Sequence, residues 1–161
     1  MSPLSLLDYN EMDARSSYRE AAVRGASPIR LVICLYEQAI EDLRRAVAAL
    51  KKGDIETRTR HINHAFMVIG QLQGSLDMER GGEVARNLAR FYSVIRYGLT
   101  EAHCKQSLPL LQQQISLLTD VHAAWLQAER ETEMSAAASS ESSATPPAIS
   151  SSNSSFAGWS G

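Results

Sequence analysis

Two histidines, His61 and His64, come closest to the spacing that a chemical site requires. They stand at i and i+3, which on a helix puts both imidazoles on one side, a geometry that can hold a metal ion. A metal site needs further ligands, and the sequence has no Glu-x-x-His pair of the kind found in di-iron bundles. We favour solvated histidines on a polar face over a metal site, and we expect neither a metal nor any other cofactor.

The other reactive residues also lack partners for catalysis. His103 and Cys104 are adjacent and cannot easily point at one centre, while Cys34 has no CxxC or metal-binding spacing. Asp77 and Glu79 are two residues apart and would point to different sides of a helix, which favours capping and turn roles over acid–base catalysis. The sequence contains no phosphate loop and no recognisable nucleophile–base motif. It therefore predicts no enzymatic activity and no catalytic residue.

Composition narrows the class of protein further. The chain has 161 residues, of which 44% are hydrophobic, enough for one domain with a core of its own. Its formal net charge is -2, without the clustered basic surplus that nucleic-acid binding needs. The longest apolar run, Leu31 to Leu35, is far shorter than the ~20 residues that span a bilayer. With no secretory signal in residues 1–12, we expect a cytoplasmic protein that neither binds nucleic acid nor inserts into membranes.

The stretch from Ala26 to Leu50 carries the clearest helix signal. Ser27 is a good N-cap and Pro28 suits the first helical turn, while Gly53 after two lysines marks the end. Apolar residues recur at three- and four-residue steps, and Ile29, Ile33 and Ile40 widen the apolar arc to roughly 160°. The extra width indicates either burial between two neighbouring helices or a surface left for a partner.

Three further helices follow with short connections. Asp54 is the N-cap candidate of a second helix that we expect to run to about Met78, and Gly81-Gly82 precedes a third. Ser107 is the N-cap candidate of a fourth. The predicted fold is all-α, an antiparallel up-down four-helix bundle with a short N-terminal cap helix and a disordered C-terminal tail.

The sequence also predicts three segments of different character. Residues 1–12 form a flexible N-terminal arm, residues 13–133 the helical domain, and residues 134–161 a Ser-rich disordered tail. Near the end of this tail, Phe156 and Trp159 are either a short docking motif or part of an inert segment.

Small and apolar residues suggest where the bundle could meet a partner. Gly70 and Gly74 lie one turn apart in the second helix, which either permits a close backbone approach or reflects simple tolerance of glycine. The fourth helix carries a second apolar stripe, well separated from its core seam on a helical wheel, that a bundle core alone would not cover. This stripe consists of Leu110, Leu117, Val121 and Ala124.

Three segments of the sequence carry motifs whose combination is more specific than any one of them. The segments are Tyr18 with Ala26-Ser27-Pro28 and Leu35-Tyr36-Glu37-Gln38-Ala39-Ile40; Ser75-Leu76-Asp77-Met78-Glu79-Arg80-Gly81-Gly82-Glu83; and Asn87-Leu88 with Tyr92. Together they resemble one protein family, the flagellar export chaperones of the FliS family, and the match covers roughly residues 13–128.

The resemblance implies a cytoplasmic chaperone that binds the disordered C-terminal segment of flagellin. Such a chaperone prevents premature polymerisation and supports delivery to a component of the flagellar type III export gate. The resemblance further implies that the N-terminal arm covers part of the binding groove until flagellin displaces it. The expected partner-binding residues are Tyr18, Ile29, Ile33, Tyr36, Ile40, Leu110, Leu117 and Val121.

A protein of a different class remains the alternative. The same apolar stripes could be buried in a weak homodimer, which would make the chain a self-associating structural bundle. A phosphotransfer module using His61 or His64 is the other form of this alternative, although the Lys and small residue that usually follow the phosphorylated histidine are missing after His64.

Overall fold

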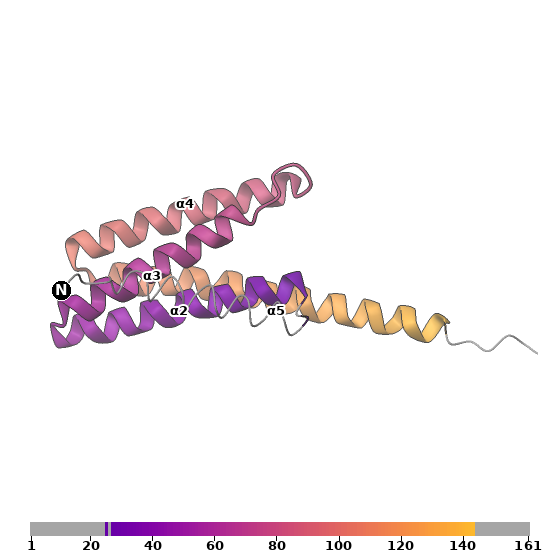
Figure 1. Ribbon diagram of the computed structural model, residues 1–161, viewed down its shortest axis with the longest axis horizontal. Helices are drawn as coiled ribbons and strands as arrows, with labels where there is room; N and C mark the ends of the chain where they lie inside the picture. The colour runs from indigo at the N-terminus through magenta and orange to yellow at the C-terminus, as the bar shows by residue number, and fades with distance from the viewer. Residues whose placement is uncertain (1–24, 26, 144–161) are drawn as a thin grey trace, which may run out of the picture. The chain divides into compact units, whose positions relative to one another are not determined.

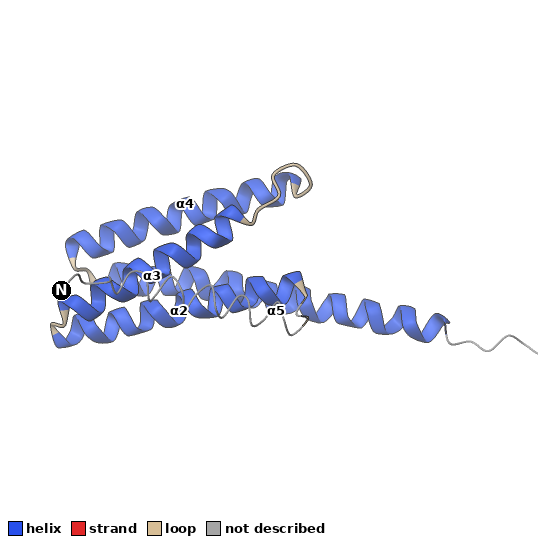
Figure 2. Cartoon of the chain, viewed as in Figure 1, coloured by secondary structure: helices blue, strands red, loops and turns tan. Residues whose placement is uncertain are grey.

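The computed structural model describes Gly25 and residues 27–143, and within them every regular element is a helix. The helices are α2 (Pro28–Lys52), α3 (Ile55–Gly74), α4 (Gly82–Lys105) and α5 (Leu108–Ser143), shown in Figures 1 and 2. The all-α prediction is confirmed for this part of the chain. The N-terminal arm and cap helix, Tyr18, and the segment with Phe156 and Trp159 lie outside the described residues.

Side-chain caps begin both α2 and α3 as the sequence predicted. The Ser27 hydroxyl accepts a hydrogen bond from the Arg30 N–H at 3.2 Å, and the Asp54 carboxylate accepts one from the Thr57 N–H at 3.1 Å. Gly53 ends α2 with a φ of 72°, a left-handed conformation that glycine adopts without strain. These caps satisfy backbone groups that the helix ends would otherwise leave unpaired.

The connection between α4 and α5 is equally short. Gln106 ends α4 with a φ of 49°, and its N–H donates to carbonyl groups of the last turn. The Ser107 hydroxyl accepts a hydrogen bond from the Leu110 N–H at 3.3 Å. The predicted Ser107 cap is therefore confirmed.

The second helix ends earlier than the sequence predicted. We expected it to reach about Met78, whereas α3 ends at Gly74. Beyond it, Asp77 Oδ1 accepts hydrogen bonds from the N–H groups of Glu79, at 3.1 Å, and Arg80, at 2.9 Å. This side chain stabilises a turn in place of further helix, which confirms its predicted turn role and explains the early end.

The close approach of a neighbour to a glycine occurs at a position the sequence analysis missed. A Cβ atom at Gly70 would lie 3.9 Å from its nearest neighbour, and one at Gly74 would meet nothing within 4 Å. In α4, by contrast, a Cβ at Gly98 would lie 2.4 Å from the Gln114 amide nitrogen. The glycine whose missing side chain leaves room for a neighbour is therefore Gly98 of α4, where the Gln114 side-chain amide of α5 occupies the space.

All four helices contribute to one hydrophobic core within the unit that ends at Glu129. Helices α2 and α5 run antiparallel within it, because Arg30 contacts Glu129 at 2.5 Å while the later Glu37 contacts the earlier His122 at 3.3 Å. The largest fully buried side chains are Tyr36, Tyr92, Ile33, Leu43, Ile62, Ile69, Leu72, Ile95, Leu99, Leu111, Leu118 and Val68.

A second unit begins at Arg130, and its described part continues α5 to Ser143. Residues 134–143 of the predicted tail therefore belong to α5, and the rest of that tail lies outside the described residues. This segment contains alanines, which favour helix, and no glycine or proline before Pro146. Among the described helices, none is long and apolar enough to cross a membrane.

Candidate partner-binding site

An apolar hollow lies where the start of α2 meets the end of α3. It has a volume of about 550 Å³ and is mostly apolar. It exists because α2 has 25 residues and α3 has 20, so α3 is shorter by roughly 7.5 Å at 1.5 Å per residue. The first turns of α2 therefore extend beyond the end of α3. The lining residues are Pro28, Leu31, Val32, Leu35, Gln71, Gly74 and Ser75.

A smaller hollow of about 230 Å³ adjoins the first, since Val32 and Ser75 line both. Its other walls come from the turn after α3, from the first turns of α4 and from Trp125 of α5. Val84 of α4, which lines it, leaves 67% of its surface exposed, and Met78 in the turn after α3 leaves 49%. We call the two hollows together the apolar groove.

Two buried tyrosines support the groove from beneath. The Tyr36 hydroxyl donates a hydrogen bond to the Tyr92 hydroxyl at 2.9 Å, and the ring centroids are 6.2 Å apart. Burial raises the pKa of both phenols above the ordinary value, so both stay protonated and neutral. Because Tyr92 also lines the smaller hollow, this pair joins the floor of the groove to the core.

None of the predicted partner-binding residues that the structure describes lines this groove. Ile33 and Tyr36 have no exposed surface and Ile40 has 5%, so surplus exposure, the reason for choosing them, does not apply to these three. The remaining described ones are half-buried and Tyr18 lies outside the described residues, so their contact with a partner stays a prediction. The half-buried ones are Ile29, Leu110, Leu117 and Val121.

Sequence reasoning placed two groove residues, Val32 and Leu35, on the core face of the main helix, and it left Leu31 out. The signal was present, because Pro28, Leu31, Val32 and Leu35 follow the i, i+3, i+4, i+7 pattern of an apolar helix face. The pattern alone cannot distinguish a covered face from an open one. That distinction depended on where α3 ends.

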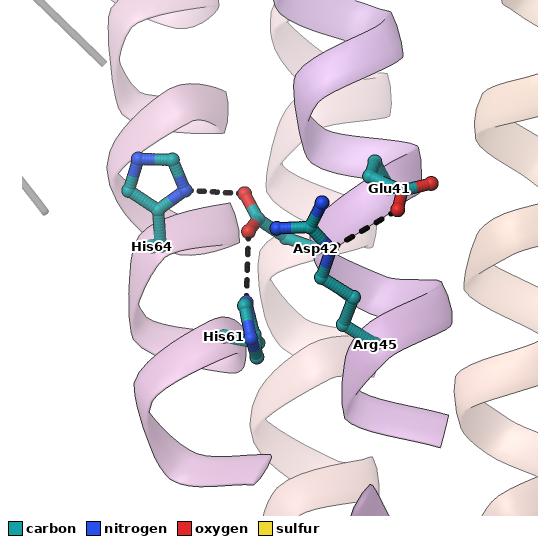
Figure 3. A network of polar contacts seen from close by, with 5 residues as sticks. All are labelled: Glu41, Asp42, Arg45, His61 and His64. Atoms are coloured by element: carbon teal, nitrogen blue, oxygen red, sulfur yellow. Dashed lines mark hydrogen bonds and ion pairs between the residues drawn. The ribbon is translucent and has the colours of Figure 1, made fainter. Parts of the chain in front are cut away.

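The two histidines occupy a buried polar contact between α2 and α3, which corrects their predicted exposure (Figure 3). Asp42 is 2% exposed and His64 is 4% exposed. The His61 Nδ1 lies 3.1 Å from one carboxylate oxygen of Asp42, and the His64 Nδ1 is hydrogen-bonded to the other. We call these three residues the Asp42 cluster.

The sequence contained a signal for this cluster. Asp42 stands three residues after Ala39 and four before Ala46, both of which are core residues of α2. An acidic residue at an inward position needs hydrogen-bond donors, because an unpaired buried carboxylate is strongly unfavourable. The matching donors are the histidines of the next helix, so the cluster holds α2 and α3 together.

Among the described residues, little favours metal binding or a reactive thiol. They contain no group of three or more His, Cys, Asp and Glu side chains placed to hold a metal ion. Cys34 is half-buried, and burial together with the nearby Glu37 carboxylate raises the pKa of its thiol, which keeps it in the unreactive protonated form. The described unit is thus a helical protein whose most distinctive surface is an open apolar groove, as in proteins that bind other polypeptides.

Comparison with known proteins assigns this helical unit to a family. Residues 11–132 match the family described as flagellar protein FliS. The chain is 37% identical over 106 residues to the flagellar secretion chaperone FliSB of Pseudomonas aeruginosa, covering 66% of this chain and 84% of that protein. It is 32% identical over 109 residues to FliS of Salmonella typhimurium, covering 67% and 81%. FliS of Vibrio cholerae is 30% identical over 112 residues, covering 70% and 82%.

The chain therefore belongs to the FliS family of flagellar secretion chaperones. This confirms the family that the three sequence segments indicated. It also confirms the interpretation of the chain as a chaperone of flagellar secretion rather than an enzyme.

Proposed function

We propose that this cytoplasmic secretion chaperone binds the disordered C-terminal segment of flagellin in the apolar groove. The observation that carries the proposal is the groove itself, two adjoining and mostly apolar hollows of about 550 Å³ and about 230 Å³. Covering the segment prevents premature polymerisation. The complex then delivers flagellin to a component of the flagellar type III export gate.

The energetics favour a partner with several apolar anchors. Ordering a disordered segment costs about 2–5 kcal/mol, whereas burying one Val, Leu or Phe side chain contributes about 1.5–3 kcal/mol. Two or three anchors are therefore needed before binding becomes favourable. The two adjoining hollows offer places for such anchors, and an amphipathic helix supplies them at i, i+3 or i+4 spacing.

The contact surface extends from the groove onto the half-buried residues that the sequence singled out. Ile29 lies one residue after Pro28, which lines the groove, and Leu117 and Val121 pack against the core from α5. A flagellin segment longer than the groove would continue across these residues. Ile33, Tyr36 and Ile40 support this surface from below.

The N-terminal arm acts as a gate in this proposal. The chain before α2 enters the helix at Pro28, and Pro28 lines the groove, so the arm with Tyr18 is tethered at the edge of the site. Arm and flagellin would then compete for the same surface. We further infer that the whole chain is an up-down bundle, with a short cap helix before α2 and a flexible tail after α5.

Isothermal titration of the full chain with a C-terminal flagellin peptide tests the site. Val32→Asp places a charge where both hollows meet, and we expect it to weaken binding at least about tenfold, which corresponds to 1.4 kcal/mol. Ile55→Asp is the matched control, because Ile55 is 62% exposed and lines neither hollow. Equal affinity of the two variants would place flagellin elsewhere.

Deletion of residues 1–24 tests the gate in the same titration. Tighter binding after the deletion supports competition between arm and flagellin, and unchanged or weaker binding contradicts it. The phosphotransfer alternative is not favoured, because the Asp42 carboxylate engages His61 and His64 within the α2–α3 interface.

A further inference from the structure

We propose that Gln71 selects which polypeptide segments the apolar groove accepts, by pairing its side-chain amide with an Asn or Gln side chain of the bound segment. This inference rests on the proposed function, because it concerns the partner of the same groove. The starting observation is a polar atom within the apolar surface. Gln71 lines the larger hollow, and its Oε1 atom is buried without a hydrogen-bond partner among the described residues.

A buried acceptor without a partner is unfavourable in the empty protein. Polar atoms that lose contact with water normally form a hydrogen bond, and an unpaired one leaves the cost of its desolvation uncompensated. Gln71 is half-buried in the last turn of α3, which ends at Gly74, so its flexible side chain can turn the amide toward the hollow. A bound segment that supplies a donor removes this cost. The groove therefore favours such a segment over a wholly apolar one.

The other polar side chains of the groove already have contacts of their own. In the larger hollow, the Ser75 hydroxyl donates a hydrogen bond to a carbonyl group of α3 at 2.8 Å. In the smaller hollow, Asp77 Oδ1 accepts hydrogen bonds from two backbone N–H groups, and Tyr92 is bonded to the second buried tyrosine. Trp125 Nε1 is also buried without a hydrogen-bond partner, but the Trp125 side chain interacts with the phenol of that second tyrosine, where it opposes the rise in pKa that burial causes. Among the described residues that line the groove, Gln71 is thus the one available to select a partner.

The chemistry of an amide indicates what the bound segment carries. A glutamine amide offers two donors and an acceptor, so a second amide can pair with it through two hydrogen bonds, each side donating once. A charged side chain would lose its hydration in this mostly apolar hollow without an opposite charge to compensate. We therefore expect an amphipathic helix whose apolar face carries one Asn or Gln between its anchors. A single buried polar residue fixes the register of coiled-coil helices in the same way.

A double-mutant cycle, measured by isothermal titration of the full chain, tests this selection. Gln71→Leu removes the amide while keeping a side chain of similar size, and the C-terminal flagellin peptide is prepared with each Asn and Gln replaced in turn by leucine. We expect Gln71→Leu to bind the unchanged peptide about tenfold more weakly, which corresponds to 1.4 kcal/mol. One substituted peptide should reverse this order and bind Gln71→Leu more tightly than it binds the unchanged chain. No reversal with any of the peptides would overturn the proposal.

Gln73→Leu is the matched control on the same helix. Gln73 Oε1 accepts a hydrogen bond from Arg96 at 3.4 Å, and Gln73 lines neither hollow. This variant should bind every peptide as the unchanged chain does. Thermal unfolding followed by circular dichroism should show Gln71→Leu folded and at least as stable as the unchanged chain, since it loses an unpaired buried acceptor. Equal weakening by Gln71→Leu and Gln73→Leu would contradict a specific role for Gln71.

The titrations of Val32→Asp and Ile55→Asp separate this proposal from the proposed function. If Val32→Asp binds more weakly than Ile55→Asp while no peptide distinguishes Gln71→Leu from the unchanged chain, flagellin enters the groove but Gln71 does not select it. If Val32→Asp and Ile55→Asp bind with equal affinity, flagellin lies elsewhere, and the selection by Gln71 is rejected together with the proposed site. A reversal at Gln71 together with weakening at Val32 supports both proposals.

Discussion

The same two helices, α2 and α3, meet in opposite ways at two places along their length. Towards the Gly53–Asp54 connection they are joined by the buried Asp42 cluster, in which one carboxylate holds both histidines. At the other end α3 stops at Gly74, and an open apolar groove takes the place of a closed interface. The difference indicates that the proposed partner site arises where α2 extends past the end of α3, while polar contacts hold the closed end.

Removing the Asp42 carboxylate should produce the largest effect on the closed end. Asp42→Ala leaves two imidazole groups in the α2–α3 interface without their acceptor, and a buried group that loses its partner costs about 1–3 kcal/mol. We expect the free energy of unfolding to fall by about 2–4 kcal/mol, as measured by urea denaturation followed by circular dichroism.

The control for this experiment is the neighbouring acidic residue. Glu41 pairs with Arg45 on the exposed side of α2 at 3.0 Å (Figure 3), and Glu41→Ala should change stability by no more than about 0.5 kcal/mol. If the two alanine variants were equally stable, the Asp42 cluster would not hold the helices together.

Filling the groove at the open end should raise stability, the opposite of the effect expected for Asp42→Ala. A Cβ at Gly74 would meet no atom within 4 Å, and Gly74 lines the groove, so Gly74→Leu adds an apolar side chain at the groove. We expect stability to rise by up to about 1 kcal/mol, because leucine favours helix over glycine, while affinity for the flagellin peptide falls. Thermal unfolding and isothermal titration measure the two quantities on the same sample.

Gly70→Ala is the matched control for the rise in stability and the fall in peptide affinity that we expect of Gly74→Leu. Gly70 lies one turn earlier on α3 and lines neither hollow, and its Cβ would be in ordinary contact with Arg96 at 3.9 Å. This variant should gain stability while keeping its affinity for the peptide. A Gly74→Leu variant that binds as tightly as the unchanged chain would mean that flagellin does not enter the groove.

The helix caps could be predicted from the sequence, whereas the Asp42 cluster at the closed end and the groove at the open end were not. Local chemistry specified the helix ends at Ser27, Gly53 and Asp54, because a cap depends on residues within one turn of it. The groove depends on where α3 ends. Apolar periodicity predicted a helix to about Met78, whereas α3 ends at Gly74. There the Asp77 side chain accepts hydrogen bonds that stabilise a turn in place of further helix. Apolar periodicity alone could not predict this boundary.

The smallest expected effect concerns the pH dependence of the closed end. Hydrogen bonds from Thr57 lower the pKa of Asp54, so the folded state favours the carboxylate of this N-cap. Because its pKa is lower in the folded state, the Asp54 cap stabilises α3 at pH values above the ordinary pKa of aspartate. This stabilisation is lost as the pH falls through the lowered pKa. Asp54→Asn keeps a side-chain acceptor but does not titrate, so its stability should vary less with pH in the acid range. Urea denaturation of both proteins between neutral and acid pH measures the difference. If the free energies of unfolding of the two proteins changed equally with pH, Asp54 would not contribute to the pH dependence of stability.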